Sequence, residues 1–327
     1  MNIDLQNFAN EVQTSTSDGL TPEMKTFYDM TLIDEAGANL VHDQFGQRRP
    51  IPANGGKIIE FRKFASLPKA TTPLTEGVTP DGKSLTVTSV TATVNQYGDY
   101  ITQSDVLELT ALDNTILETT KILGRQAGLT LDTVVRNVLQ SGTNVTYCPK
   151  VVDGVETEIT SRSGLTQGCQ LTVDVVMQVV AKLRAQNAPT FDGSYVAIIH
   201  PYVAYDLMRD PEWIDAHKYA QPENLFTGEI GQIAGVRFVQ TTEAKIYDGG
   251  IFGTLFLGAD AYGITEVTGG GLQTIVKQKG SAGTADPLDQ RSSVGWKAMR
   301  TAELLIPNYI VRVESYSNRF SGIAQAN

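Results

Sequence analysis

Residues able to bind metals or perform acid–base catalysis are few in this chain and widely separated. The three histidines, His42, His200 and His217, cluster neither with each other nor with cysteines at metal-ligand spacing. His200 follows an apolar run and precedes Pro201, which is more typical of a capping or core histidine than of a catalytic one. We therefore predict no metal site and no catalytic residue.

Motifs for nucleotide-dependent or hydrolytic chemistry are also absent or incomplete. The sequence has no G-x-S-x-G nucleophile motif. The glycines of residues 228–235 precede a predicted strand instead of opening a helix, so they do not fit a dinucleotide fingerprint. The glycines of residues 269–271 lack the Lys-Ser/Thr pair of a phosphate-binding loop. The sequence predicts a protein that is not an enzyme and that uses no cofactor.

The cysteines and the hydropathy pattern bear on the compartment of the protein. Cys148 and Cys169 fit neither a C-x-x-C motif nor a disulfide framework, so we expect reduced structural thiols, as in a cytosolic protein. No stretch is apolar enough to span a bilayer, and the opening MNIDLQNFAN lacks the basic and apolar regions of a signal peptide. We expect no contact with a membrane.

The chain is acidic, and its charge is unevenly distributed. Lys plus Arg total 26 against 36 Asp plus Glu, a net charge of −10. Such a chain does not coat itself on nucleic acid by counterion release, although it can still enclose nucleic acid. Acids outnumber bases in residues 1–50, whereas bases outnumber acids in residues 55–85 and 291–320. These blocks either guide identical copies into register or form an ordinary solvated surface.

The longest predicted helix covers residues 115–140. Its apolar residues recur at spacings of three, four or seven and form one stripe: Ile116, Leu123, Ala127, Leu131, Val134 and Val138. Gly124 and Gly128 weaken a helix by about 1 kcal/mol each relative to alanine. We therefore expect both glycines to face a close backbone neighbour, and we favour the strands near the C-terminal end as that neighbour.

A ribbon with a polar tip precedes this helix. Residues 57–64 and 85–102 predict two strands, and the second is unusually long. The segment between them has three prolines and hardly any large apolar residue, so it cannot build a core of its own. A two-stranded ribbon is marginal by itself in water. We expect it to rest on the remainder of this chain or on a neighbouring copy.

The remaining elements frame the ribbon and the long helix. A helix is predicted over residues 21–44, after a polar arm. From residue 171 the pattern becomes α/β, with a helix at 173–186 and strands at 195–199, 236–240, 254–257 and 272–279. Two alternating strands follow at 294–305 and 308–316.

With these elements in this order, the chain resembles the major capsid proteins of tailed bacteriophages with the Hong Kong 97-like (HK97-like) fold, and at finer grain their N-four-like branch. The resemblance is carried by LTEGVTPDGKSLTVTSVTATVNQYGDYITQSDVLELTALD (74–113), AGLTLDTVVRNVLQSGTNV (127–145), GEIGQIAGVRFVQT (228–241) and DPLDQRSSVGWKAM (286–299). It implies an α+β fold and a structural protein that self-assembles into hexamers and pentamers of an icosahedral head enclosing double-stranded DNA.

The resemblance implies a division of the chain into four parts. Residues 1–54 would be the N-terminal arm, and residues 55–102 the extended loop, a β-hairpin that reaches over the adjacent subunit. Residues 103–165 with 290–327 would form the peripheral domain, whose spine is the helix at 115–140. Residues 166–289 would form the axial α/β domain.

The resemblance also implies partners and a location. The chain would bind other copies of itself, a separate scaffolding protein, a portal and possibly a decoration protein, and would enclose DNA without sequence-specific binding. It would be a virion component assembled in the host bacterial cytoplasm. Five charged residues are expected at the subunit interface: Arg62, Lys63, Lys69, Glu76 and Lys83. The first three would meet carboxylates of the adjacent copy.

Two alternatives stay open at this point. One is the shell protein of a bacterial nanocompartment, encapsulin-like, with the same fold but with enzyme cargo. The other is an unrelated cytosolic α/β enzyme.

Overall fold

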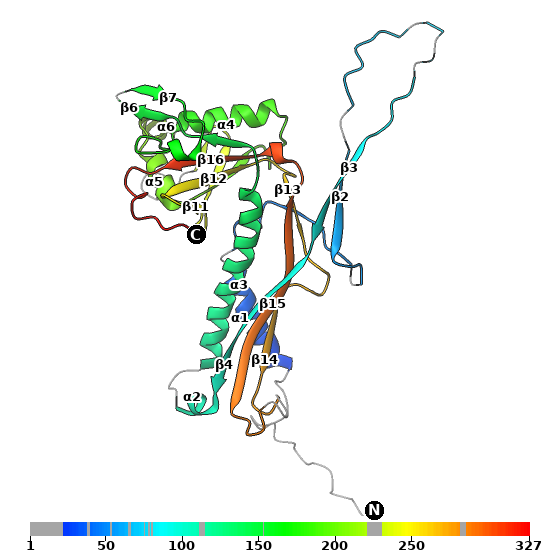
Figure 1. The fold of residues 1–327 in the computed structure, drawn as a ribbon, viewed down its shortest axis with the longest axis vertical. Coiled ribbons are helices and arrows are strands. Elements are labelled where there is room, and N and C mark those ends of the chain that lie inside the picture. Colours follow the sequence, from blue (N-terminus) through cyan, green and yellow to red (C-terminus); the bar gives the residue numbers. More distant parts are fainter. Residues whose placement is uncertain are drawn as a thin grey trace, which may run out of the picture. The chain divides into compact units, whose positions relative to one another are not determined.

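The computed structural model describes residues 22–327 apart from 38–39, 53, 65–66, 75, 78, 80, 111–114, 153, 221–230 and 282–285. Contacts divide the chain into two compact units. Unit 1 comprises Met1–Ala38, Tyr97–Gly128 and Leu272–Ala298, and unit 2 comprises Asn39–Gln96, Leu129–Gly271 and Met299–Asn327. Helix α3 (Thr115–Gln140) and strand β15 (Arg291–Leu304) each run through both units (Figure 1).

A seven-stranded mixed sheet forms the centre of unit 2. Its order is β5-β16-β12-β8-β10-β9, with β11 beside β12. β10 is parallel to β8, and β12 is antiparallel to both β8 and β16. The strands are β5 (Val145–Tyr147), β8 (Tyr195–Ile199), β9 (Gln232–Ile233), β10 (Val236–Gln240), β11 (Ile246–Tyr247), β12 (Ile251–Leu257) and β16 (Ile310–Tyr316).

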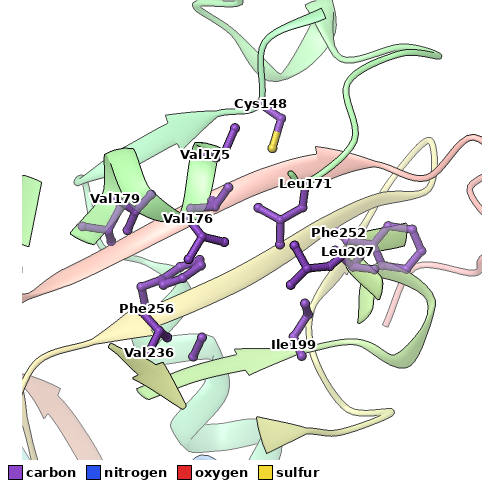
Figure 2. Close-up of a cluster of buried hydrophobic side chains, with 14 of the residues drawn as sticks. Cys148, Leu171, Val175, Val176, Val179, Ile199, Leu207, Val236, Phe252 and Phe256 are labelled. Atoms are coloured by element: carbon purple, nitrogen blue, oxygen red, sulfur yellow. The ribbon is translucent and has the colours of Figure 1, made fainter. Parts of the chain in front are cut away.

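Helices cover both faces of this sheet. Ala197 and Ile199 of β8 belong to the same apolar core as α4 (Val173–Ala185), α5 (Pro201–Met208) and Trp213 of α6 (Pro211–Ala220), a core shown in part in Figure 2. Ile198 belongs to a second core with the C-terminal part of α3. Burial of both faces explains why β8 is an unbroken apolar run and why Thr254 is the one polar residue of β12.

Smaller elements complete unit 2. The ribbon is formed by β2 (Ile58–Phe64) and β3 (Val87–Thr93), and β6 (Lys150–Val152) pairs with β7 (Val155–Thr157) in a hairpin. β1 (Gln47–Arg48) is parallel to β13 (Tyr262–Thr265), which in turn is antiparallel to the C-terminal part of β15. Two 3-10 turns are η1 (Arg162–Gly164) and η3 (Pro307–Tyr309).

Unit 1 is built around the N-terminal parts of α3 and β15. β14 (Gln273–Lys277) and β4 (Asn95–Ser104) both pair with β15, and the short helix α2 (Asp105–Thr110) follows β4. Helix α1 (Pro22–Gly37) lies beside α3, and Arg125 of α3 pairs with Glu35 of α1 at 3.0 Å. Within the described ranges, no helix is long and apolar enough to cross a bilayer.

The two glycines of α3 have the close backbone neighbour that was predicted, but the neighbour is α1 and not the C-terminal strands. A Cβ at Gly124 would lie 2.9 Å from the Leu32 carbonyl oxygen, and one at Gly128 would lie 2.5 Å from that of Ala36. Gly124 and Gly128 are four positions apart on α3, as Leu32 and Ala36 are on α1, so a four-residue row of one helix packs against a four-residue row of the other. The glycines allow the two backbones to approach.

Three other predicted details are corrected. The helix expected over 21–44 ends at Gly37. Residues 42–46 form a turn and bends, and the backbone amides of Val41 and His42 donate to the side chain of Asp132. The strand expected over 85–102 is divided at Val94, since β3 pairs with β2 and β4 pairs with β15. The buried stripe of α3 ends with Val135 and Leu139, not Val134 and Val138, because a four-residue row slants around the helix. The four-part division of the chain stays a prediction.

Candidate assembly surface

The ribbon of β2 and β3 is a regular antiparallel pair. Its register runs from Ile58 opposite Thr93 to Phe64 opposite Val87. Valine and threonine dominate β3, and such β-branched residues favour extended backbone. In Figure 1 the chain between the two strands continues beyond their ends as a long open loop and does not fold back along them.

The base of the ribbon is anchored on the remainder of unit 2. Phe61, Ala92 and Val94 are buried, and the Val94 amide donates to the Lys57 carbonyl at 2.8 Å. Phe61 packs so closely on β13 that a Cβ at Gly263 would lie 2.7 Å from its ring. Glycine is therefore required at position 263 to admit the phenylalanine. The base is fixed by this contact, whereas most of the loop beyond it is exposed.

The five predicted interface residues are spread along the ribbon and do not form one cluster. Arg62 lies on β2 with its guanidinium 3.7 Å from the Glu60 carboxylate, and both side chains are largely exposed. Lys69, Glu76 and Lys83 are exposed in the loop. Lys63 lies on β2, and its side chain is outside the described part of the structure. The interface role of these residues stays a prediction.

A pocket of about 190 Å³ lies beside the base of the ribbon. Phe61, Val90, Leu305 and Ile306 supply its apolar lining, and Gln47, Arg49, Arg62 and Asp260 supply its polar lining. The Arg49 guanidinium lies 6.0 Å from the centre of the Phe61 ring. Sequence reasoning found only Arg62 of this set, because the residues come from separate segments that no local pattern connects. We call this feature the ribbon-base pocket.

A buried polar network holds the segment that carries Gln47 and Arg49. His42 and Asp132 are fully buried, with 2.7 Å between His42 Nδ1 and Asp132 Oδ2. The Tyr262 hydroxyl donates to the His42 carbonyl at 2.5 Å, and burial raises the pKa of that hydroxyl. Asp43 accepts from Arg48 at 2.8 Å and pairs with Arg300. These contacts fix the segment against α3, β13 and β15. Sequence reasoning missed the network, although a carboxylate beside the buried Leu131 was a signal.

Residues 114–253 match a family model described as phage capsid protein. The capsid protein of cyanophage Pam1 superposes with a TM-score of 0.66 at 12% identity, over 97% of this chain and 99% of that one. The capsid protein of cyanophage P-SCSP1u superposes with a TM-score of 0.65 at 14% identity, over 96% of this chain and 93% of that one. The capsid protein of Ralstonia phage GP4 superposes with a TM-score of 0.64 at 13% identity, over 97% of this chain and 98% of that one. No curated protein sequence matches the chain significantly.

The chain has the HK97-like fold of phage capsid proteins, and its residues 114–253 match the phage capsid family. The prediction of an α+β fold of this kind is confirmed over nearly the whole length of the chain. The matched family segment begins at the start of α3 and ends within β12. The family match and the fold agree with the prediction of a structural capsid protein, and the nanocompartment alternative is not favoured over the phage one.

A second charged network in this chain fastens η1 to the central sheet. Glu314 of β16 is fully buried and accepts from Arg162 at 2.5 and 2.6 Å, and Arg312 lies 2.9 Å away. These hydrogen bonds raise the pKa of Arg162, whose guanidinium also lies 3.6 Å from the centre of the Tyr247 ring. Two arginines thus balance one buried carboxylate, an arrangement that costs about 3–5 kcal/mol when one partner is removed.

The side chains best suited to catalysis or metal binding have structural roles. His200 caps α5, as predicted: its Nδ1 accepts from the Tyr202 amide at 3.1 Å, and burial lowers its pKa to about 4. Cys148 and Cys169 are buried free thiols, and burial raises the pKa of Cys148. Among the residues that the structure describes, no group of His, Cys, Asp or Glu side chains is placed to hold a metal ion.

Proposed function

We propose that this capsid protein is the major building block of an icosahedral phage head and assembles as hexamers and pentamers around double-stranded DNA. The observation that carries the proposal is the ribbon, whose base is anchored by Phe61 and whose connecting loop exposes Leu74 and Leu85. A two-stranded ribbon gains stability when it packs on another surface. Laid across an adjacent copy and repeated around a closed shell, modest contacts stabilise the whole assembly.

The five charged ribbon residues are proposed to set the register between copies. An exposed ion pair contributes only about 0–1 kcal/mol, so Arg62, Lys63, Lys69, Glu76 and Lys83 would add little strength individually. Complementary charges nevertheless disfavour wrong alignments, because like charges then face each other. Arg62 is suited to this role since its nearest carboxylate, Glu60, is exposed and easily exchanged for one on a neighbour.

The proposal includes the finer features that the resemblance implied. The chain would follow the four-part division and belong to the N-four-like branch. A separate scaffolding protein and a portal would join it in the host cytoplasm, with a decoration protein as an optional partner. The net charge of −10 supports enclosure of DNA without sequence-specific binding, because an acidic wall does not hold the packaged polymer.

Deletion of residues 66–83 tests this function. The deletion removes the loop beyond the paired strands, so we expect a folded subunit, by circular dichroism and gel filtration, that forms no shells under electron microscopy. The full-length chain, expressed alone and with its scaffolding partner, is the positive control, and Val155→Ser in the exposed β6–β7 hairpin is the matched surface variant. Closed particles from the deletion variant would contradict the overlap model. A full-length chain that never assembles would contradict the shell function itself.

A further inference from the structure

We propose that the ribbon-base pocket receives the ribbon tip of another copy of this chain, with Leu74 in its apolar part and Glu76 paired with Arg49 and Arg62. This inference rests on the proposed shell function and specifies one contact of it. The partner is therefore a second copy of the chain, and the contact joins the tip of one ribbon to the base of another.

The pocket has the size and lining for one aliphatic side chain beside one carboxylate. Its volume is about 190 Å³, and Phe61, Val90, Leu305 and Ile306 line its apolar part. Two guanidinium groups and the carboxylate of Asp260 leave one positive charge in excess. Within the described residues Arg49 has no carboxylate in ion-pair contact, and Arg62 has only the exposed Glu60 at 3.7 Å. A single incoming carboxylate would balance this charge.

The tip of the ribbon carries the matching groups. Leu74 is 77% exposed, more than Leu67 or Leu85 in the same loop. Glu76 is exposed two residues later, at the start of a turn that Gly77 completes with a φ of 76°. Leu74 and Glu76 are only two positions apart in the sequence, so both can enter one pocket of this volume. The loop therefore presents an aliphatic group and a carboxylate together.

The pocket is not filled by the tip of its own ribbon. Leu74 lies ten residues beyond Phe64, where β2 ends, and Figure 1 shows the loop extending away from the paired strands. Phe61, at the pocket, and Leu74, at the tip, thus lie at opposite ends of the same ribbon in unit 2. A tip from another copy can enter a pocket that the chain's own tip does not reach.

Disulfide trapping tests the contact directly. Leu74→Cys combined with Val90→Cys places one thiol on the tip and one in the pocket, while the native cysteines are buried. We expect oxidised shells of this variant to give a ladder of covalent multimers on non-reducing gels. Leu74→Cys with Val155→Cys is the control, since Val155 is exposed elsewhere in unit 2 and should give no ladder. Closed shells without a ladder, or equal ladders from both variants, overturn the inference and leave the shell function standing.

A charge exchange provides a second measurement. Arg62→Glu and Glu76→Arg alone should each lower shell yield about tenfold, because like charges then meet in the pocket, and the two together should restore it. Arg237→Glu, an exposed change on β10, should leave the yield unchanged. If the double variant assembles no better than either single variant, Glu76 does not pair with Arg62. If the unaltered chain forms no shells, the failure belongs to the proposed function.

Discussion

His200 shows how a residue with catalytic potential serves the fold. Its Nδ1 accepts from the Tyr202 amide, so the ring must be neutral to cap α5. The ring also lies 5.1 Å from that of Phe252, in a setting that disfavours charge. Burial accordingly lowers its pKa to about 4. Protonation would remove the acceptor and place a charge in an apolar site.

This shift predicts acid sensitivity. Histidine in the unfolded chain has a pKa of about 6.5, so the unfolded state binds the proton first. The stabilisation is therefore complete above pH ~6.5 and is lost as the pH falls towards about 4. His200→Asn keeps a capping acceptor and should make the melting temperature of the unassembled subunit less dependent on pH in this range. Burial raises the pKa of Asp206, which gives the opposite dependence of stability on pH. Asp206 is present in both the parent and the His200→Asn variant, so it affects both equally. Identical pH profiles would contradict the assignment.

Sequence reasoning at the residue scale succeeded where the signal was local. The capping role of His200 followed from an apolar run before it and Pro201 after it. The pair of His42 and Asp132 could not be predicted in this way, because 90 positions separate the residues and the position of Asp132 beside Leu131 does not identify its partner. The ribbon-base pocket was missed for the same reason. Its lining residues meet only when β1, the ribbon and the chain after β15 are in place.

At the scale of elements, the contact between α1 and α3 depends on the absence of side chains. Leu32 and Ala36 of α1 lie over Gly124 and Gly128 of α3, and their carbonyl oxygens occupy the space of the missing Cβ atoms. Glycine is unfavourable in a helix, so this packing offsets a cost in helix propensity. The spacing of the two glycines predicted a close neighbour. The identity of that neighbour required the tertiary structure.

Gly128→Ala measures this packing. Alanine would gain about 1 kcal/mol in helix propensity, but its Cβ would lie 2.5 Å from the Ala36 carbonyl oxygen. Overpacking of this kind costs about 1–3 kcal/mol, so we expect a net loss of up to about 2 kcal/mol in the free energy of unfolding, measured by urea denaturation of the subunit. Gly37→Ala is the control, since no atom lies within 4 Å of its added Cβ. A Gly128→Ala protein as stable as the parent would show that α1 can move away at little cost.

The long helix and the buried strands were predictable, whereas the division of the ribbon was not. Residues 115–140 have a clear helical period, and α3 has these bounds. Residues 85–102 alternate without interruption, yet the chain changes pairing partner at Val94. Periodicity reports that backbone is extended but does not report which strand it pairs with. The partner depends on β2 and β15, which lie on either side in the sequence and far apart.

At the scale of the whole molecule, the charge of each copy opposes assembly at low ionic strength. Each chain carries −10, and the screening length falls from about 30 Å at 0.01 M salt to about 8 Å at 0.15 M. We expect the rate of shell formation, followed by light scattering, to rise over this range and to decline near ~1 M, where exposed ion pairs are screened as well. Sucrose at matched osmolality controls for crowding and hydration. A rate that falls steadily from the lowest salt would show that attraction between oppositely charged blocks dominates.

The network around His42 also has a consequence for biosynthesis. The bond between the Tyr262 hydroxyl and the His42 carbonyl spans 220 positions, and Arg300, further along the chain, pairs with Asp43. At about 5–20 residues per second, a ribosome needs roughly 10–40 s to extend the chain from His42 to Tyr262. The segment after α1 therefore lacks these two contacts until most of the polypeptide has been made. Each subunit therefore completes this network only near the end of translation.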